Sequence, residues 1–193
     1  AYIRSQRGVD PKQAKDVARD MAGKDAANPD SLFAQLAVAE AQIDAKNFDA
    51  AETAAKRAIA LAPDSSLAHF MMGGIAMARG ETDKTQYAAA RPWFTKAHKL
   101  DLKDPRPMIG LYMSYFEAGE SIPEDALITL EDAWDYASYD AGYRLILARQ
   151  LLNENKGKLA KDVLSPIAFS AHGTEKENKI LATVEFIEQD KLD

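Results

Sequence analysis

The sequence predicts an all-α fold built from repeated antiparallel helix hairpins. A recurring alanine stands at Ala14, Ala51, Ala90, Ala126 and Ala160, at intervals of 37, 39, 36 and 34 residues. Each of these alanines is followed, four and seven positions on, by another small or apolar residue, which marks one face of a helix. Small residues on such a face let a neighbouring helix approach closely. A period of this length therefore indicates hairpins that stack along the chain.

The first complete hairpin is predicted over residues 30–64. Ala39 precedes Ala51 by 12 residues, Ala58 follows it by seven, and Pro63 ends the unit. This spacing resembles the tetratricopeptide repeat, a helix-turn-helix motif of about 34 residues. The resemblance implies a right-handed superhelix of antiparallel helix hairpins.

Three further repeats are predicted over residues 65–104, 105–138 and 139–172. In the first of them, about five extra residues near positions 81–86 are expected to lengthen the turn. In the next, about two inserted residues lie near positions 121–123, and Tyr112 stands where the family usually has a small residue.

Two prolines fall inside expected second helices. Proline lacks the backbone donor that a helix interior uses, and its ring clashes with the preceding turn. We therefore expect the second helix of repeat 65–104 to begin close to Pro92, and that of repeat 139–172 to bend at Pro166.

The two ends of the sequence predict incomplete units. Residues 1–29 are interpreted as a partial repeat, which suggests that the chain begins inside a unit of a longer protein; a short strand at its start is the alternative. Residues 175–193 are amphipathic and predict a helix that caps the open end of the stack, with a partner-binding helix as the alternative. The whole chain, 1–193, is thus predicted to be a single solenoid domain.

Composition narrows the classes of partner. The formal net charge of −6 and the pI near 5.2 argue against nucleic-acid binding, which depends on clustered Lys and Arg. No apolar run approaches the ~20 residues that span a bilayer, so no membrane insertion is expected. The absence of cysteine suits either the bacterial cytoplasm or the periplasm. The sequence therefore predicts a soluble protein but leaves its compartment open.

No motif in the sequence indicates catalysis. The three histidines, His69, His98 and His172, are far apart, and neither a zinc-ligand pair nor a phosphate loop nor a nucleophile elbow is present. His69 is expected to be a packed or surface residue. Carboxylates on exposed helices are usually solvated, because acid–base catalysis needs converging groups. We therefore predict no catalytic residue, no metal, no cofactor and no enzymatic activity.

A second apolar face recurs on the first helix of each repeat. It consists of apolar pairs seven residues apart, which share a helix face: Leu36 and Ile43, Phe70 and Met77, Ile109 and Phe116, and Leu145 and Leu152. Glu40, Met113 and Arg149 lie on the same wall and would add polar selectivity and adaptable contact. The family resemblance implies that this face lines a concave peptide-binding groove. The alternative is that these residues pack under neighbouring helices and widen the core.

The chemistry of this face indicates the kind of ligand. Family members that grip acidic peptide termini use Lys and Asn here, whereas this sequence has Leu36, Phe70 and Ile109. We therefore predict a scaffold that binds a protein or peptide partner through an apolar helix or extended segment.

A second function stays open. The segments at residues 4–10, 91–94 and 164–173 resemble the C-terminal repeat region of uncharacterised proteobacterial proteins, some with an upstream peptidase-like domain. That resemblance implies an accessory module that docks a missing N-terminal domain.

Overall fold

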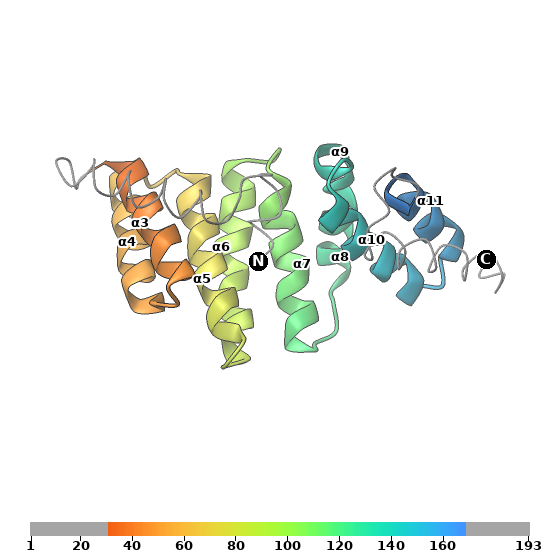
Figure 1. Ribbon diagram of the computed structural model, residues 1–193, viewed down its shortest axis with the longest axis horizontal. Helices are drawn as coiled ribbons and strands as arrows, with labels where there is room; N and C mark the ends of the chain where they lie inside the picture. The colour runs from red at the N-terminus through yellow and green to blue at the C-terminus, as the bar shows by residue number, and fades with distance from the viewer. Residues whose placement is uncertain (1–30, 169–193) are drawn as a thin grey trace. The chain divides into compact units, whose positions relative to one another are not determined.

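The structure, a computed structural model, describes residues 31–168, and every regular element in this range is a helix (Figure 1). The helices are α3 (Leu32–Asp44), α4 (Phe48–Leu61), α5 (Ser66–Gly80), α6 (Thr85–Leu100), α7 (Pro105–Ala118), α8 (Glu124–Asp132), α9 (Trp134–Ala137), α10 (Ala141–Asn153) and α11 (Gly157–Ala168). Helices pack as sequential hairpins, α3 with α4, α5 with α6, α7 with α8 and α10 with α11. The all-α prediction is confirmed. The expected partial repeat at 1–29 and the expected cap at 175–193 lie outside the described residues.

The described residues fall into two compact units. Residues 31–136 carry α3 to α8, and residues 137–168 carry α10 and α11; the short helix α9 reaches the boundary between them. Within the first unit, α5 packs on α4, α6 and α7, so each hairpin is joined to the next.

The start of each first helix is set by a capping side chain. Ser31, Ser65, Asp104 and Asp140 have extended backbones and accept a hydrogen bond from a backbone N–H in the first turn. Such caps satisfy donors that have no partner within the helix, and each contributes about 1 kcal/mol. The helix starts therefore follow directly from the sequence.

The recurring alanines form the contact surface between helices. Ala51, Ala90, Ala126 and Ala160 are fully buried, as the spacing predicts, whereas Ala14 lies outside the described residues. In the first unit, the alanines and small residues of α4 pack with α3 and α5 around Met71, Met72 and Ile75.

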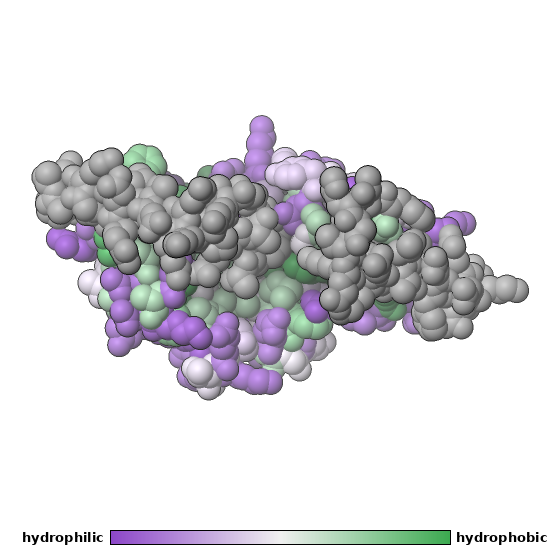
Figure 2. Space-filling model, viewed as in Figure 1, coloured by the Kyte–Doolittle hydropathy of each residue, from purple (hydrophilic) through white to green (hydrophobic). Residues whose placement is uncertain are grey.

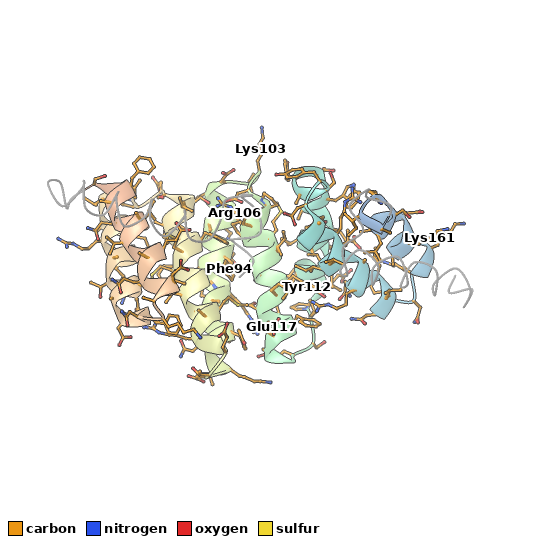
Figure 3. All side chains as sticks on the ribbon, viewed as in Figure 1. Phe94, Lys103, Arg106, Tyr112, Glu117 and Lys161 are labelled. Atoms are coloured by element: carbon orange, nitrogen blue, oxygen red, sulfur yellow. The ribbon has the colours of Figure 1, made fainter. Side chains whose placement is uncertain are left out.

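Two glycines let one aromatic ring pack directly against the backbones of two helices. The ring of Phe94, on α6, lies against Gly73 of α5 and Gly110 of α7 (Figure 3). A Cβ atom at Gly73 would come within 2.5 Å of Phe94 Cε1, and one at Gly110 within 2.8 Å. The ring, only 2% exposed, thus joins three consecutive helices.

The extra residues of the second hairpin lengthen its helices more than its turn, which corrects the expectation of a longer turn. Helices α5 and α6 have 15 and 16 residues, against 13 and 14 in α3 and α4. The turn at 81–84 is one residue longer than the turn at 45–47. In the third hairpin, the expected insertion does lie in the connecting loop, at 119–123.

The expectation that α6 begins close to Pro92 is wrong. Helix α6 begins at Thr85 and continues through Pro92 to Leu100. The proline removes the helical donor for the carbonyl of Ala88, but both residues are exposed, so water can bond that carbonyl. Pro166 lies within α11, two residues before its end at Ala168.

Candidate interaction face

The first helices of successive hairpins form one layer in the unit 31–136. Helix α5 packs on α3 on one side and on α7 on the other. An antiparallel helix, α4 or α6, connects each of these helices to the next along the chain. Helices α3, α5 and α7 therefore run in the same direction (Figure 1). Their C-terminal ends lie at the edge formed by the turns 45–47, 81–84 and 119–123, here named the turn edge.

Side chains from these three helices meet on one face of the layer. The guanidinium carbon of Arg106 lies 5.1 Å from the centre of the Phe70 ring, a cation–π contact between α7 and α5. The pKa of Arg106 is raised above its ordinary value, chiefly by its hydrogen bonds to Asp104 and, in smaller part, by the charge of Glu40 on α3. We give the name inner face to the predicted groove residues of these three helices together with Arg106: Leu36, Glu40, Ile43, Phe70, Met77, Arg106, Ile109, Met113 and Phe116.

Three residues of the inner face belong to the interior. Leu36, Phe70 and Ile109 are 6%, 4% and 1% exposed. The Phe70 ring also packs on Phe94, with ring centres 5.7 Å apart. These positions agree with the alternative that part of the apolar face widens the core, and a ligand would meet them only in small part.

The other apolar residues of the inner face are half-buried. They lie on all three helices of the layer: Ile43 on α3, Met77 on α5, and Met113 and Phe116 on α7. The Phe116 ring stacks on buried Tyr112, with ring centres 6.2 Å apart. Glu40 is exposed beside them. Four apolar side chains of the inner face are therefore partly exposed.

The predicted residues of the last repeat lie in the other unit. Leu145, Arg149 and Leu152 are half-buried on α10, within 137–168. They share a face of α10 by their spacing.

The sequence reasoning missed two residues of these helices. Phe33 is 67% exposed and precedes Leu36 by three residues, and Arg106 precedes Ile109 by three. Residues three apart share a helix face, so the same periodicity could have found both. Figure 2 shows hydrophobic surface over α5 to α7 with hydrophilic surface below it.

Two arginines connect successive hairpins. Arg79 of α5 donates to Glu52 of α4 at 2.5 Å, and hydrogen bonds from Lys56 and Arg79 hold the pKa of Glu52 below its ordinary value. Arg91 of α6 stacks 3.7 Å from the centre of the Tyr115 ring and donates to Glu120 at 2.8 Å. These contacts stabilise the layer.

No group of three or more His, Asp or Glu side chains among residues 31–168 could hold a metal. Asp104 is the carboxylate that is buried in this range, and it is bonded to Arg106 and to the start of α7. His69 is buried, bonds the Pro63 carbonyl through Nε2 at 2.9 Å and stacks on Trp93, which is a packing role. His172 lies outside the described residues.

No helix within 31–168 has the combination of length and apolar character that crossing a membrane requires.

Comparison with known proteins supports the fold. No protein-family model and no curated protein matches the sequence. The chain is similar to TTC0263, a tetratricopeptide protein of Thermus thermophilus, with a TM-score of 0.69 and 15% identity over 88% of this chain and 89% of that one. It is also similar to YrrB, described as a tetratricopeptide protein with an unusual peptide-binding site, with a TM-score of 0.62 and 16% identity over 91% and 96% of the two chains.

A third similar structure is yeast Tom70, with a TM-score of 0.70 and 17% identity; the match covers 98% of this chain and 39% of Tom70. At such low identity, similarity of structure establishes the fold alone. The helix hairpins, the buried small residues and these neighbours together show that the chain has the tetratricopeptide-repeat fold.

Proposed function

We propose that the chain is a non-catalytic scaffold and that its inner face binds an apolar segment of a partner protein. One observation carries the proposal: Ile43, Met77, Met113 and Phe116 are half-buried apolar side chains on three parallel helices. A row of this kind can receive the apolar side of a short helix or of an extended segment.

The residue types at these positions suit recognition. Methionine is flexible and polarisable, so Met77 and Met113 can adapt to a ligand surface. Phe116 is held in place by its stacking on Tyr112, so it would lose little conformational freedom on binding. The exposed Phe33 offers a further aromatic contact near the start of α3.

Selection from a displayed library of random peptides tests the proposal with the whole chain as bait. Binding of the selected peptides is then measured by fluorescence anisotropy for Met77→Gln and Met113→Gln, which remove apolar contact without changing charge. Ile128→Gln on α8 is the matched control, because Ile128 is 51% exposed and lies outside the inner face. Circular dichroism checks that all variants fold.

We expect the two inner-face variants to bind at least about fivefold more weakly, as about 1 kcal/mol of lost burial implies, and the control to bind like the parent. Equal binding by all four proteins would overturn the proposal. A selection that yields no peptide dependent on this face would favour the alternative function, docking of an upstream N-terminal domain.

A further inference from the structure

Arg106 has a guanidinium group whose orientation is set by two contacts. Its Nε donates to Oδ1 of Asp104 at 2.8 Å and its Nη2 donates to Oδ2 at 2.6 Å, which is the two-pronged geometry of a strong arginine–carboxylate pair. The guanidinium carbon also lies 5.1 Å from the centre of the Phe70 ring. Asp104 is itself buried and accepts a hydrogen bond from the backbone N–H of Arg106. A ligand would therefore meet a guanidinium that is already ordered.

One amino group of this guanidinium is available to a ligand. Nη1 forms no hydrogen bond to any residue within 31–168. The group is planar, so with Nε and Nη2 facing Asp104 the N–H bonds of Nη1 point away from that carboxylate. The Arg106 side chain is 28% exposed, against 8% for Asp104. Nη1 can therefore donate to a molecule that is bound on the inner face.

The charges around Arg106 favour an uncharged acceptor. Asp104 already neutralises the guanidinium at a distance of 2.6 Å. The negative charges of Asp101 and Glu40 also act on it, and Figure 3 shows the Lys103 side chain extending away from the helices. A ligand carboxylate would meet this excess of negative charge. A main-chain carbonyl can accept the hydrogen bond without adding a charge.

The conformation of the partner segment follows from that acceptor. Inside a helix, except in its last turn, each carbonyl already accepts a hydrogen bond from its own chain, whereas an extended segment has free carbonyls. Arg106 and Met113 are seven residues apart on one face of α7, which is about 10.5 Å along the helix. Three extended residues span about 10 Å. An extended segment can thus reach both side chains at once.

We propose that Nη1 of Arg106 donates a hydrogen bond to a main-chain carbonyl of the partner segment, and that this segment is extended where it lies on Arg106. An apolar side chain about three residues away then lies on Met113. This inference rests on the proposed function and decides between the two conformations that it allows. Arg106 recognises the backbone of the ligand, whereas Met77 and Met113 contact its apolar side chains.

Ester substitution in the ligand tests this hydrogen bond without changing the protein. The probe is the tightest-binding peptide from the displayed library, synthesised with one amide at a time replaced by an ester, whose carbonyl is a weaker acceptor. We expect one ester, about three residues from an essential apolar residue, to weaken binding to the parent chain about fivefold. Esters at the other positions are the matched controls.

A double-mutant cycle links that ester to Arg106. Arg106→Met combined with Asp104→Asn removes the guanidinium without leaving an unpaired buried charge, and asparagine can still cap α7. Asp104→Asn alone is the control, because it keeps the guanidinium. We expect the double variant to bind the all-amide peptide about tenfold more weakly and to be insensitive to the ester, with the control within about twofold of the parent. Circular dichroism checks that both variants fold.

Equal effects of every ester on the parent and on the double variant would overturn the inference, as would binding of the double variant at the parent's affinity. If Met77→Gln and Met113→Gln weaken binding while the cycle shows no coupling, the backbone contact fails and the proposed function stands. If no selected peptide depends on the inner face, both fail. If the double variant does not fold, Arg106→Lys replaces it, because lysine keeps a cation beside Asp104 but lacks the planar fork. The ester should then weaken binding to that variant by less than it weakens binding to the parent.

Discussion

At the residue scale, the packing of Phe94 requires glycine at two positions. The ring is 2% exposed and lies between the backbones of α5 and α7, at Gly73 and Gly110. A methyl group at either glycine would occupy space that the ring already fills. Because the ring is held on both sides, it cannot move away from one helix without approaching the other.

Gly73→Ala is therefore expected to destabilise the protein, by about 1–3 kcal/mol of overpacking. This exceeds the gain of up to about 1 kcal/mol that alanine brings to a helix interior. Urea unfolding followed by circular dichroism measures the change. Phe94→Leu in the same chain should remove the clash, so the double variant should lose less stability than the sum of the two single variants. A more stable Gly73→Ala protein would contradict this packing.

The Glu52 carboxylate links stability to pH. Hydrogen bonds from Lys56 and Arg79 lower its pKa below the ordinary 4.5. A lowered pKa in the folded state means that the contribution to stability is present above about pH 4.5 and is lost as the pH falls through the folded-state value.

Glu52→Gln should thus lower the free energy of unfolding at pH 7 by about 1 kcal/mol, and the difference from the parent should shrink at pH 3. Urea unfolding at the two pH values checks this. An equal difference at both would show that the charge of Glu52 is not what stabilises the contact between α4 and α5.

Periodicity predicted which residues face a neighbouring helix but not how deeply each is buried. The recurring alanines are buried as expected. Leu36 and Ile43 share a helix face by the same rule, yet Leu36 is buried and Ile43 is half-buried. Burial depends on how closely the next hairpin approaches, and that distance is set by tertiary packing.

At the scale of elements, α6 shows how a helix can contain proline. Pro92 is the eighth residue of this 16-residue helix, and it is exposed. The sequence shows that Pro92 removes one backbone hydrogen bond, but it does not show that the helix continues past it. Helix α6 packs on both α5 and α7, and these contacts hold it through the missing bond.

Pro92→Ala is expected to stabilise the protein by about 1–3 kcal/mol, because it restores a backbone donor for the carbonyl of Ala88. Thermal unfolding gives the direction of the change. Pro105→Ala is the control, since Pro105 stands at the first position of α7, where a donor is not needed. Loss of stability in the Pro92 variant would show that packing of α6 requires the proline.

The lengths of the helices in the second hairpin could not be predicted from the sequence either. The residues near Glu81 are polar and resemble a turn, but α5 extends to Gly80 and α6 starts at Thr85. Gly80 permits this because the Tyr87 ring of α6 packs directly on its backbone. A contact between two different helices cannot be recognised from the periodicity of either one.

At the scale of the whole molecule, the repeat period was enough to predict the fold, because each hairpin uses the same small residues for the same contact. The candidate site was predicted only in part. The spacing selected Met77, Met113 and Phe116, but the contact of Arg106 with Phe70 required the packing of α7 on α5.

Methionine methyl resonances test the central claim most directly. Met77 and Met113 are half-buried on the inner face, whereas Met71, Met72 and Met108 are 7%, 5% and 3% exposed in the core. In a protein labelled with ¹³C at the methionine methyl groups, titration with a selected peptide should shift the Met77 and Met113 signals and leave the three core signals nearly unchanged. Saturable binding that leaves Met77 and Met113 unmoved would show that the partner binds elsewhere and would contradict the account.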